Sequence, residues 1–241
     1  MRVRLPLGRG LFFLCAFLIA LAALLPLRLA LSWLDLDGSG LSARRAAGSI
    51  WFGVLRGARV AGAPVGDLSA RLDPLPLVTG RARVDFRRLG GGDVADTLQG
   101  AASVTRHSFG IDDVTATLPL GQALAPLPIG GLDLSDVSAR FRDGLCERAE
   151  GLVRARLTGD IAGVSLPGGL SGNARCEGGA LMLPMVSQGG GEMLAVSLSQ
   201  GGQFRAELTM RPGDDAARAR LLAAGFAPAG DGLRLAIQGT L

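Results

Sequence analysis

Few side chains in this sequence have the type and spacing needed for chemistry. His107 is the single histidine, and Ser108 beside it suggests a serine–histidine pair for nucleophilic catalysis. Adjacent residues of a β-strand point to opposite faces, however, and the sequence places no acid that could orient the imidazole. We therefore interpret His107 as a surface or turn residue, and we predict that the chain has no catalytic residue and is not an enzyme.

Pairs of carboxylates and runs of glycine are the other candidates for a reactive site. The Asp pairs at 112–113 and 214–215 could supply an acid and a base or bind a metal ion. Neighbouring positions splay apart, so we interpret the first pair as a solvated strand face and the second as a helix cap. The glycine triplets at 90–92 and 189–191 lack the Gly-Lys-Ser/Thr ending of a phosphate loop, and an acidic residue follows each. The sequence thus predicts turns at these glycines and no cofactor or metal site.

The cysteines favour an exported domain. Cys15 lies in an apolar segment, whereas Cys146 and Cys176 are the only two in the remainder of the chain. Two cysteines of an exported domain usually form a disulfide, which over this interval of ~30 residues would stabilise the fold by about 3–4 kcal/mol. Two unpaired thiols are the alternative. A metal site is disfavoured because the one imidazole is distant in sequence.

An uncharged apolar run at residues 11–27 dominates the amino-terminal part of the chain. Three Arg precede this run, and Arg28 follows it before a second apolar stretch that ends at Trp33 and Leu34. The guanidinium of Arg28 can extend to the lipid headgroups, so the helix can continue to an aromatic residue suited to the far interface. We therefore predict a transmembrane anchor over residues 11–34.

The basic residues also set the expected orientation. A short basic tail stays in the cytoplasm, which makes residues 1–10 a cytoplasmic tail and residues 35–241 an extracytoplasmic domain. The alternative is a cleaved signal peptide, because Ala20 and Ala22 form a small-x-small pair after the apolar core. Beyond the first 34 residues, 21 Arg balance 21 Asp and Glu. The domain is therefore neutral, and nucleic acid is not expected as a partner.

The residues after the anchor alternate between apolar and polar at a period of two, which is typical of β-strands with one wet face. Strands are predicted at residues 49–60, 66–72, 81–87, 98–106, 110–118, 132–141, 152–161, 172–177, 180–186, 193–200, 203–211 and 233–240. Their short spacing favours antiparallel meanders over βαβ units. One helix is expected at residues 216–224, capped by Asp214 and stopped by Gly225. Leu221 and Leu222 would pack it against the sheet.

Three segments repeat one pattern, at residues 65–72, 111–118 and 134–141. In each, an Asp at the third position precedes alternating apolar and polar residues, so three apolar side chains share one face. The repeat predicts hairpins laid side by side in an extended, curved antiparallel sheet, not a closed barrel. The expected fold class is mainly β, with one amino-terminal transmembrane helix and one short helix near the carboxyl terminus. Without an opposing sheet, the apolar face would stay open to a partner or a ligand.

Several short segments share the pattern of a known family. They are Gly48-Ser49-Ile50-Trp51-Phe52-Gly53, Asp73-Pro74-Leu75, residues 221–225, Gly232-Leu233 and residues 239–241. Together with the anchor before them, these segments resemble the type II secretion system protein N family.

The resemblance implies a periplasmic domain of a non-enzymatic inner-membrane component of the type II secretion system. Such a component would act in assembly or link the inner-membrane platform to the secretin, and these subunits and the inner membrane are its expected partners. Trp51 is then a core plug or a docking aromatic, with Gly48, Gly53 and Pro74 as further structural or interaction positions. The family is also similar to the AsmA-like group, whose curved sheets hold lipid. Binding or transport of lipid or lipopolysaccharide is therefore the alternative function.

Overall fold

The computed structural model describes residues 7–27, 41–60, 63–90, 97–119, 127, 129–157, 169–199 and 201–240. Its helices are α1 (Leu7–Ala23), α3 (Pro74–Val78) and α4 (Asp215–Ala223). Its strands are β1 (Leu41–Ser42), β2 (Arg45–Gly48), β3 (Gly53–Val60), β4 (Ala63–Asp73), β5 (Ala82–Arg88), β6 (Leu98–Val104), β7 (Ser108–Pro119), β8 (Ile129–Arg142), β9 (Leu145–Leu157), β10 (Leu170–Asn173), β11 (Arg175–Glu177), β12 (Ala180–Val186), β13 (Glu192–Leu198), β14 (Gln203–Met210), β15 (Ala227–Ala229) and β16 (Gly232–Thr240).

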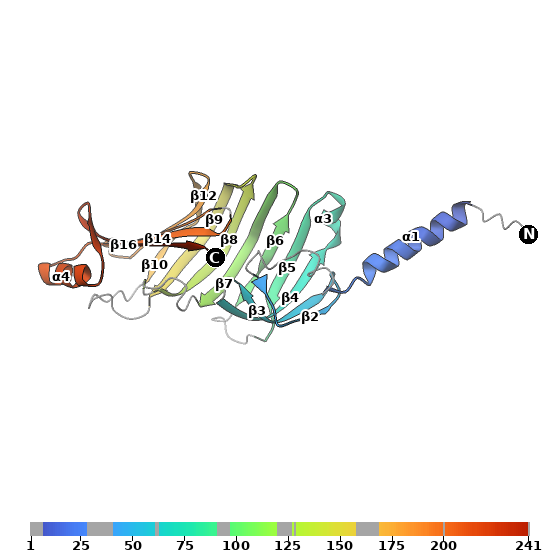
Figure 1. Cartoon of the computed structure of the whole chain (residues 1–241), viewed down its shortest axis with the longest axis horizontal. Helices are drawn as coiled ribbons and strands as arrows, with labels where there is room; N and C mark the ends of the chain where they lie inside the picture. Colours follow the sequence, from blue (N-terminus) through green and yellow to red (C-terminus); the bar gives the residue numbers. More distant parts are fainter. Residues whose placement is uncertain are drawn as a thin grey trace, which may run out of the picture.

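All of these strands belong to one antiparallel sheet. They are hydrogen-bonded in the order β1-β3-β4-β5-β6-β7-β8-β9-β10-β12-β13-β14-β16-β15, with β2 beside β3 and β11 beside β12. Most neighbours in the sheet are also neighbours along the chain, so the sheet is a meander (Figure 1). The extended, curved antiparallel sheet expected from the sequence is confirmed.

Within the described residues the predicted strands correspond to strands of the structure, with differences at particular joints. Residues 158–161 and residue 200, which end two predicted strands, lie outside the described part of the chain. The strand predicted at 49–60 begins only at Gly53, because residues 49–52 form a turn after β2. The strand predicted at 172–177 is interrupted at Ala174, whose N–H donates to the carbonyl oxygen of Gly151 at 2.9 Å. The sequence does not predict β1, β2 or β15, which are too short for an alternating pattern to be recognised.

The apolar residues of the strands line one face of the sheet and form two clusters. The amino-terminal cluster contains Leu55, Leu68, Leu98 and Val114 from β3, β4, β6 and β7. The larger carboxyl-terminal cluster takes its side chains from strands between β8 and β16 and from α4. Within the described residues no polar or charged residue is buried, because the period of two places these side chains on the outer face.

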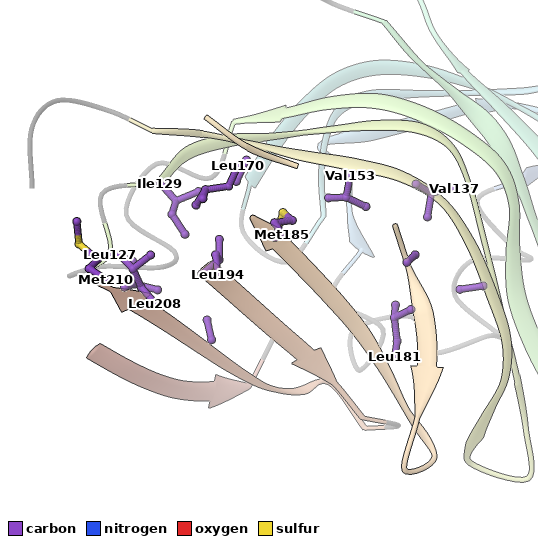
Figure 2. Close-up of a cluster of buried hydrophobic side chains, with 14 of the residues drawn as sticks. Leu127, Ile129, Val137, Val153, Leu170, Leu181, Met185, Leu194, Leu208 and Met210 are labelled. Carbon is purple, nitrogen blue, oxygen red and sulfur yellow. The ribbon is translucent and has the colours of Figure 1, made fainter. Parts of the chain in front are cut away.

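The sheet curls so strongly that its carboxyl-terminal half forms two layers. Figure 2 shows Val137, Val153 and Leu170 of β8, β9 and β10 pointing toward Met185 and Leu194 of β12 and β13. All five are buried, and burying a large apolar side chain contributes about 1.5–3 kcal/mol. The expectation of an uncovered apolar face is therefore wrong for this half of the molecule, since the sheet covers its own apolar side chains.

Bulges at the repeated Asp residues bend the sheet. Asp113 of β7 and Asp136 of β8 both have a φ of 51°, and the strand register shifts beside each of them. Thr115 Oγ1 donates to Asp136 Oδ1 at 3.1 Å, and the Asp113 N–H donates to Ser138 Oγ at 2.9 Å. A hydroxyl of each of these two repeats thus supports the bulge of the other. Because a bulge increases local twist, the repeat supplies curvature as well as an apolar face.

The apolar amino-terminal segment forms a shorter helix than predicted. α1 spans Leu7–Ala23 instead of residues 11–34. It ends before Pro26, which has no N–H to continue a helix and which bridges to Ser49 instead. Among the described residues no helix is both long and apolar enough to cross a bilayer, so the predicted transmembrane helix is not found. Residues 28–34 of the predicted anchor lie outside the described part of the chain.

The predicted carboxyl-terminal helix is confirmed as α4. Asp214 caps it by accepting a hydrogen bond from the Ala217 N–H at 2.6 Å. The chain leaves the helix at Gly225, whose φ of 93° suits a residue without a Cβ. Leu221 is fully buried, but Leu222 is 42% exposed. Only the first of the two leucines therefore packs against the sheet.

Candidate interaction surface

His107 lies in the turn between β6 and β7, and the fold places an acid, Asp143, beside its imidazole, although the sequence offered none. Its Nδ1 is 3.3 Å from Asp143 Oδ1 in the turn between β8 and β9, and both side chains are exposed. The Asp143 N–H also donates to the carbonyl oxygen of His107 at 2.8 Å. Ser108 Oγ lies 2.8 Å from Thr105 Oγ1, so its hydroxyl is engaged there. These contacts join two neighbouring turns, and the sequence reading of His107 as a turn residue is confirmed.

The first Asp pair contributes to an ion-pair network on the outer face. Asp112 lies 3.2 Å from Arg83 Nη1 and 3.8 Å from Arg140 Nη2, and Ser103 Oγ donates to it at 3.3 Å. Asp113 occupies a bulge instead, so the two carboxylates do not act together. Ion pairs that remain partly exposed contribute about 0–1 kcal/mol each. We therefore interpret the network as part of the polar outer surface of the sheet, with a small contribution to stability.

The part of the chain that the structure describes has no cluster of metal-ligating side chains, but it has surface depressions. This part contains no group of three or more His, Cys, Asp or Glu able to hold a metal ion. Two open surface depressions, of about 470 and 430 Å³, have mixed polar and apolar linings. Phe204, Arg205 and Gln238 are among the residues lining the first, and Val65 and Arg88 are among those lining the second. The second lining also includes Asp67, whose Oδ1 accepts from the Gly57 N–H at 2.8 Å, while Arg88 Nε donates to the carbonyl oxygen of Val65 at 2.8 Å.

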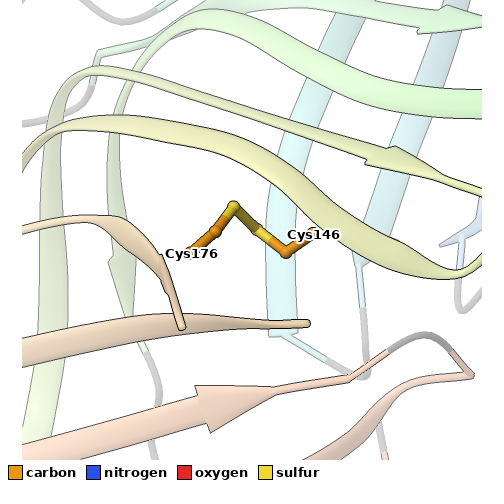
Figure 3. The surroundings of a disulfide bond; sticks show 2 residues. All are labelled: Cys146 and Cys176. Carbon is orange, nitrogen blue, oxygen red and sulfur yellow. A yellow bond between two sulfur atoms is a disulfide. The ribbon is translucent and has the colours of Figure 1, made fainter. Parts of the chain in front are cut away.

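Cys146 and Cys176 form the predicted disulfide (Figure 3), with a Cα–Cα distance of 5.4 Å. The bond joins β9 to β11, which pairs with β12 and not with β9. The covalent link thus ties the two layers of the carboxyl-terminal half together. Cys15 is the free cysteine and is exposed on α1.

Trp51 lies in the turn between β2 and β3 and is half-buried. The sequence reading that placed it inside a strand is therefore wrong. Gly48 and Gly53 pair across this turn as the last residue of β2 and the first of β3. Gly48 has a φ of 93°, which lets the chain reverse at a place where a Cβ would meet the backbone of Phe52. Gly48 is thus required by the turn itself.

The same turn receives the end of the amino-terminal segment. The Ile50 N–H donates to the carbonyl oxygen of Leu25 at 3.1 Å, directly beside the bridge from Pro26. Leu27 packs against the amino-terminal cluster, and a Cβ at Gly53 would collide with its side chain. The segment that resembles the family pattern therefore attaches α1 to the sheet.

Pro74 is the first residue of α3, a single helical turn that connects β4 to β5. Asp73 caps the turn by accepting a hydrogen bond from the Leu75 N–H at 3.1 Å. None of the residues of α3 is buried, and Leu75 and Val78 are largely exposed. From the sequence, Asp73-Pro74-Leu75 is expected only as a turn of the family pattern, and the exposure of its apolar side chains is not predicted. The feature of the sequence that could have predicted this exposure is the run of Pro, Leu and Val between two strands, because polar residues usually occupy such turns.

Part of the concave, apolar face remains open in the middle of the sheet. Direct pairing places Ala82, Val104, Phe109, Phe141 and Cys146 in one row across β5 to β9. The rings of Phe109 and Phe141 are stacked with centroids 4.8 Å apart. Phe141 and Cys146 are buried, whereas Val104 and Phe109 are about half exposed. We call Ala82, Val104 and Phe109 the open strip.

The outermost strands at both edges of the sheet are short. At one edge, β1 has two residues and β2 has four. At the other edge, β15 has three residues, and Pro228 in its centre lacks an N–H. Short or proline-containing edges hinder the addition of a further strand. β15 pairs only with residues 232–234 of β16, however, so among the described residues the rest of β16 pairs with β14 alone. This stretch and the exposed apolar side chains are both candidates for contact with a partner.

Comparison with known proteins identifies the family. The model of the family described as type II secretion system (T2SS), protein N matches residues 39–236. Type II secretion system protein N of Vibrio cholerae is 30% identical over 151 residues, and the aligned part is 60% of this chain and 60% of that protein. The chain thus spans about 60% of the length of this curated relative. No solved structure matches the chain. Because the family match covers most of the sequence, the chain belongs to the type II secretion system protein N family.

Proposed function

We propose that the chain is a non-enzymatic scaffold of the type II secretion system, which acts in assembly or links the inner-membrane platform to the secretin. Its family makes it a component of a secretion machinery of the cell envelope, with other secretion subunits as partners. In the proposed arrangement residues 1–10 are cytoplasmic, the apolar amino-terminal segment attaches the chain to the inner membrane, and the sheet lies in the periplasm.

The composition of α1 supports attachment to a membrane. Its side chains include Phe12, Phe13 and Phe17, all of them exposed, and its first turn contains no acidic residue. A contiguous apolar surface of this kind is unfavourable in water and favourable in lipid. The disulfide supports a periplasmic location for the sheet, because such bonds persist in oxidising compartments.

The exposure of the open strip is the main observation that supports the scaffold role. The strip is apolar, it lies on a rigid sheet, and it continues into the buried row at Phe141. A partner that inserts apolar side chains beside Val104 and Phe109 would extend this row and remove exposed apolar area from water.

Site-specific crosslinking in cells tests this proposal. A photoreactive phenylalanine analogue at Phe109 is expected to crosslink to a subunit of the inner-membrane platform or to the secretin. The matched control is the same analogue at Met193, which is similarly exposed but lies on the outer face of β13. Deletion of the gene is expected to reduce export of secreted proteins. Normal export together with no captured secretion subunit would contradict the scaffold role.

Lipid carriage is a second candidate, favoured by the apolar character of the same strip. The space available is restricted, because the carboxyl-terminal half is filled by its own side chains. Native mass spectrometry of the gently purified full chain tests this candidate. If the strip holds lipid, Val104→Glu should remove the bound lipid and Met193→Glu should retain it. A chain that never carries lipid excludes this function and leaves the scaffold role.

A further inference from the structure

One end of the sheet carries a group of exposed apolar side chains beside the junction with α1. Phe52 is 65% exposed, Leu75 78% and Val78 88%, and Leu77 is also exposed. We call these four residues the apolar tip. They come from two turns, the β2–β3 turn and α3, and none of them contributes to either buried cluster. Single exposed apolar residues are common, but several from adjacent turns form a surface that water disfavours.

Hydrogen bonds hold the turn of the apolar tip in shape. Asp73 Oδ1 accepts from the Leu75 N–H at the start of α3. Thr79 Oγ1 donates to the carbonyl oxygen of Pro76 at 2.8 Å, and the Arg81 N–H donates to the same oxygen at 3.0 Å. Two prolines further restrict the backbone of this turn. The exposure of its apolar side chains is therefore a fixed property of the fold.

Strand register places α3 at the same end of the strands as the β2–β3 turn, which contacts the residues that follow α1. Gly53 pairs with Ala70, which brings Phe52 beside Arg71 of β4, and the Arg71 guanidinium lies 5.0 Å from the centre of the Phe52 ring. β4 continues only to Asp73, where α3 begins. Figure 1 accordingly shows α1 leaving the body on the side where β2 and α3 lie.

The charges around the apolar tip suit an anionic lipid surface. Arg71 and Arg81 are exposed on either side of α3, and no acidic residue lies in its first turn. Two carboxylates lie nearby, and both are engaged: Asp73 accepts the cap hydrogen bond, and Asp85, which is paired with Arg71 across β4 and β5, accepts from Arg83 Nε at 3.2 Å. Apolar side chains flanked by Arg are typical of segments that rest at the boundary between headgroups and acyl chains. Arg side chains there are attracted to anionic lipids.

We propose that the apolar tip is a second membrane contact, which inserts Leu75 and Val78 into the leaflet from which α1 emerges. The inference rests on the proposed attachment of α1 to the membrane. It goes beyond that attachment because it predicts the orientation of the sheet relative to the bilayer. With two contacts, the end of the sheet that carries α3 faces the lipid. The opposite end, which carries α4, points away from the membrane.

Fluorescence quenching in vesicles tests the second contact on the full-length chain. In a Cys15→Ser background, a polarity-sensitive fluorophore is attached in separate variants at Val78→Cys, Val186→Cys and Phe17→Cys. The chains are reconstituted in vesicles of phosphatidylethanolamine and phosphatidylglycerol that contain spin-labelled lipids. Val186 is the matched control, because it is an exposed valine that ends β12 at the other end of the strands. The probes at Val78 and Phe17 should be quenched by the lipids, and the probe at Val186 should not.

The three probes separate failure of this inference from failure of the proposed function. If the probe at Phe17 is quenched while that at Val78 behaves like that at Val186, the second contact is wrong and the attachment of α1 stands. If the probe at Phe17 is not quenched, the attachment itself is wrong, and the second contact fails with it. Shielding of Val78 only after addition of other secretion subunits would also overturn the proposal, since the tip would then bind protein.

Discussion

At the scale of single residues, Asp136 shows how one side chain type supports the curvature of the sheet. Its φ of 51° is unfavourable for a residue branched at Cβ, such as Val. Its carboxylate accepts a hydrogen bond from Thr115 Oγ1. We expect Asp136→Val to lower the free energy of unfolding by about 1–3 kcal/mol, because the strained backbone remains and the hydrogen bond is lost. Urea denaturation measures this change.

Glycine at the same position separates backbone strain from the hydrogen bond. Asp136→Gly removes the carboxylate but accepts a positive φ without strain, so it should destabilise the chain less than Asp136→Val. Equal unfolding midpoints for the two variants would show that the left-handed backbone at Asp136 does not limit stability. Exposure of Asp136 makes this comparison clean, since neither variant leaves a cavity in the core.

At the scale of elements, α4 shows how packing distinguishes two adjacent leucines. Leu221 is fully buried against the sheet, whereas Leu222 is exposed on the other side of the helix. Leu221→Ala is expected to lower the free energy of unfolding by about 2–5 kcal/mol through the cavity that it leaves. Leu222→Ala should change it by less than about 1 kcal/mol. Thermal or urea unfolding of both variants measures the difference, and similar losses would mean that α4 packs through both side chains.

At the scale of the whole molecule, the disulfide holds the two layers of the carboxyl-terminal half together. Replacing both Cys146 and Cys176 by Ser is expected to lower the free energy of unfolding by about 3–4 kcal/mol, because the unfolded chain is no longer cross-linked. Cys15→Ser is the control, since this thiol is exposed and unpaired. Unfolding under oxidising and reducing conditions measures the effect. An unchanged midpoint on reduction of the natural chain would contradict a stabilising role for the bond.

The local features of the fold could be read from the sequence because they depend on near neighbours along the chain. Alternation of apolar and polar residues gives the strands and their wet faces, and Asp214 with Gly225 bounds α4. The two domain cysteines are paired as predicted. The end of α1 was also readable, since Pro26 carries the signal that stops a helix. The sequence reading extended the helix across it because hydropathy alone continues further.

The candidate surfaces could not be read in this way. Trp51 and Phe52 lie in a turn that contacts the residues after α1, and the exposure of Val78 depends on where β4 ends and β5 begins. Val104 and Phe141 belong to one apolar row, yet the first is exposed and the second is buried. No pattern along the chain distinguishes them.

The sequence by itself determined which side of each strand is apolar, because a period of two assigns alternate side chains to opposite faces. Only the tertiary structure decided how much of that face is covered. Twist and bulges accumulate over the sheet until β12 and β13 lie opposite β8 and β9. These strands are distant in sequence, so their meeting, and the open strip that it leaves, follow from the curvature of the whole sheet.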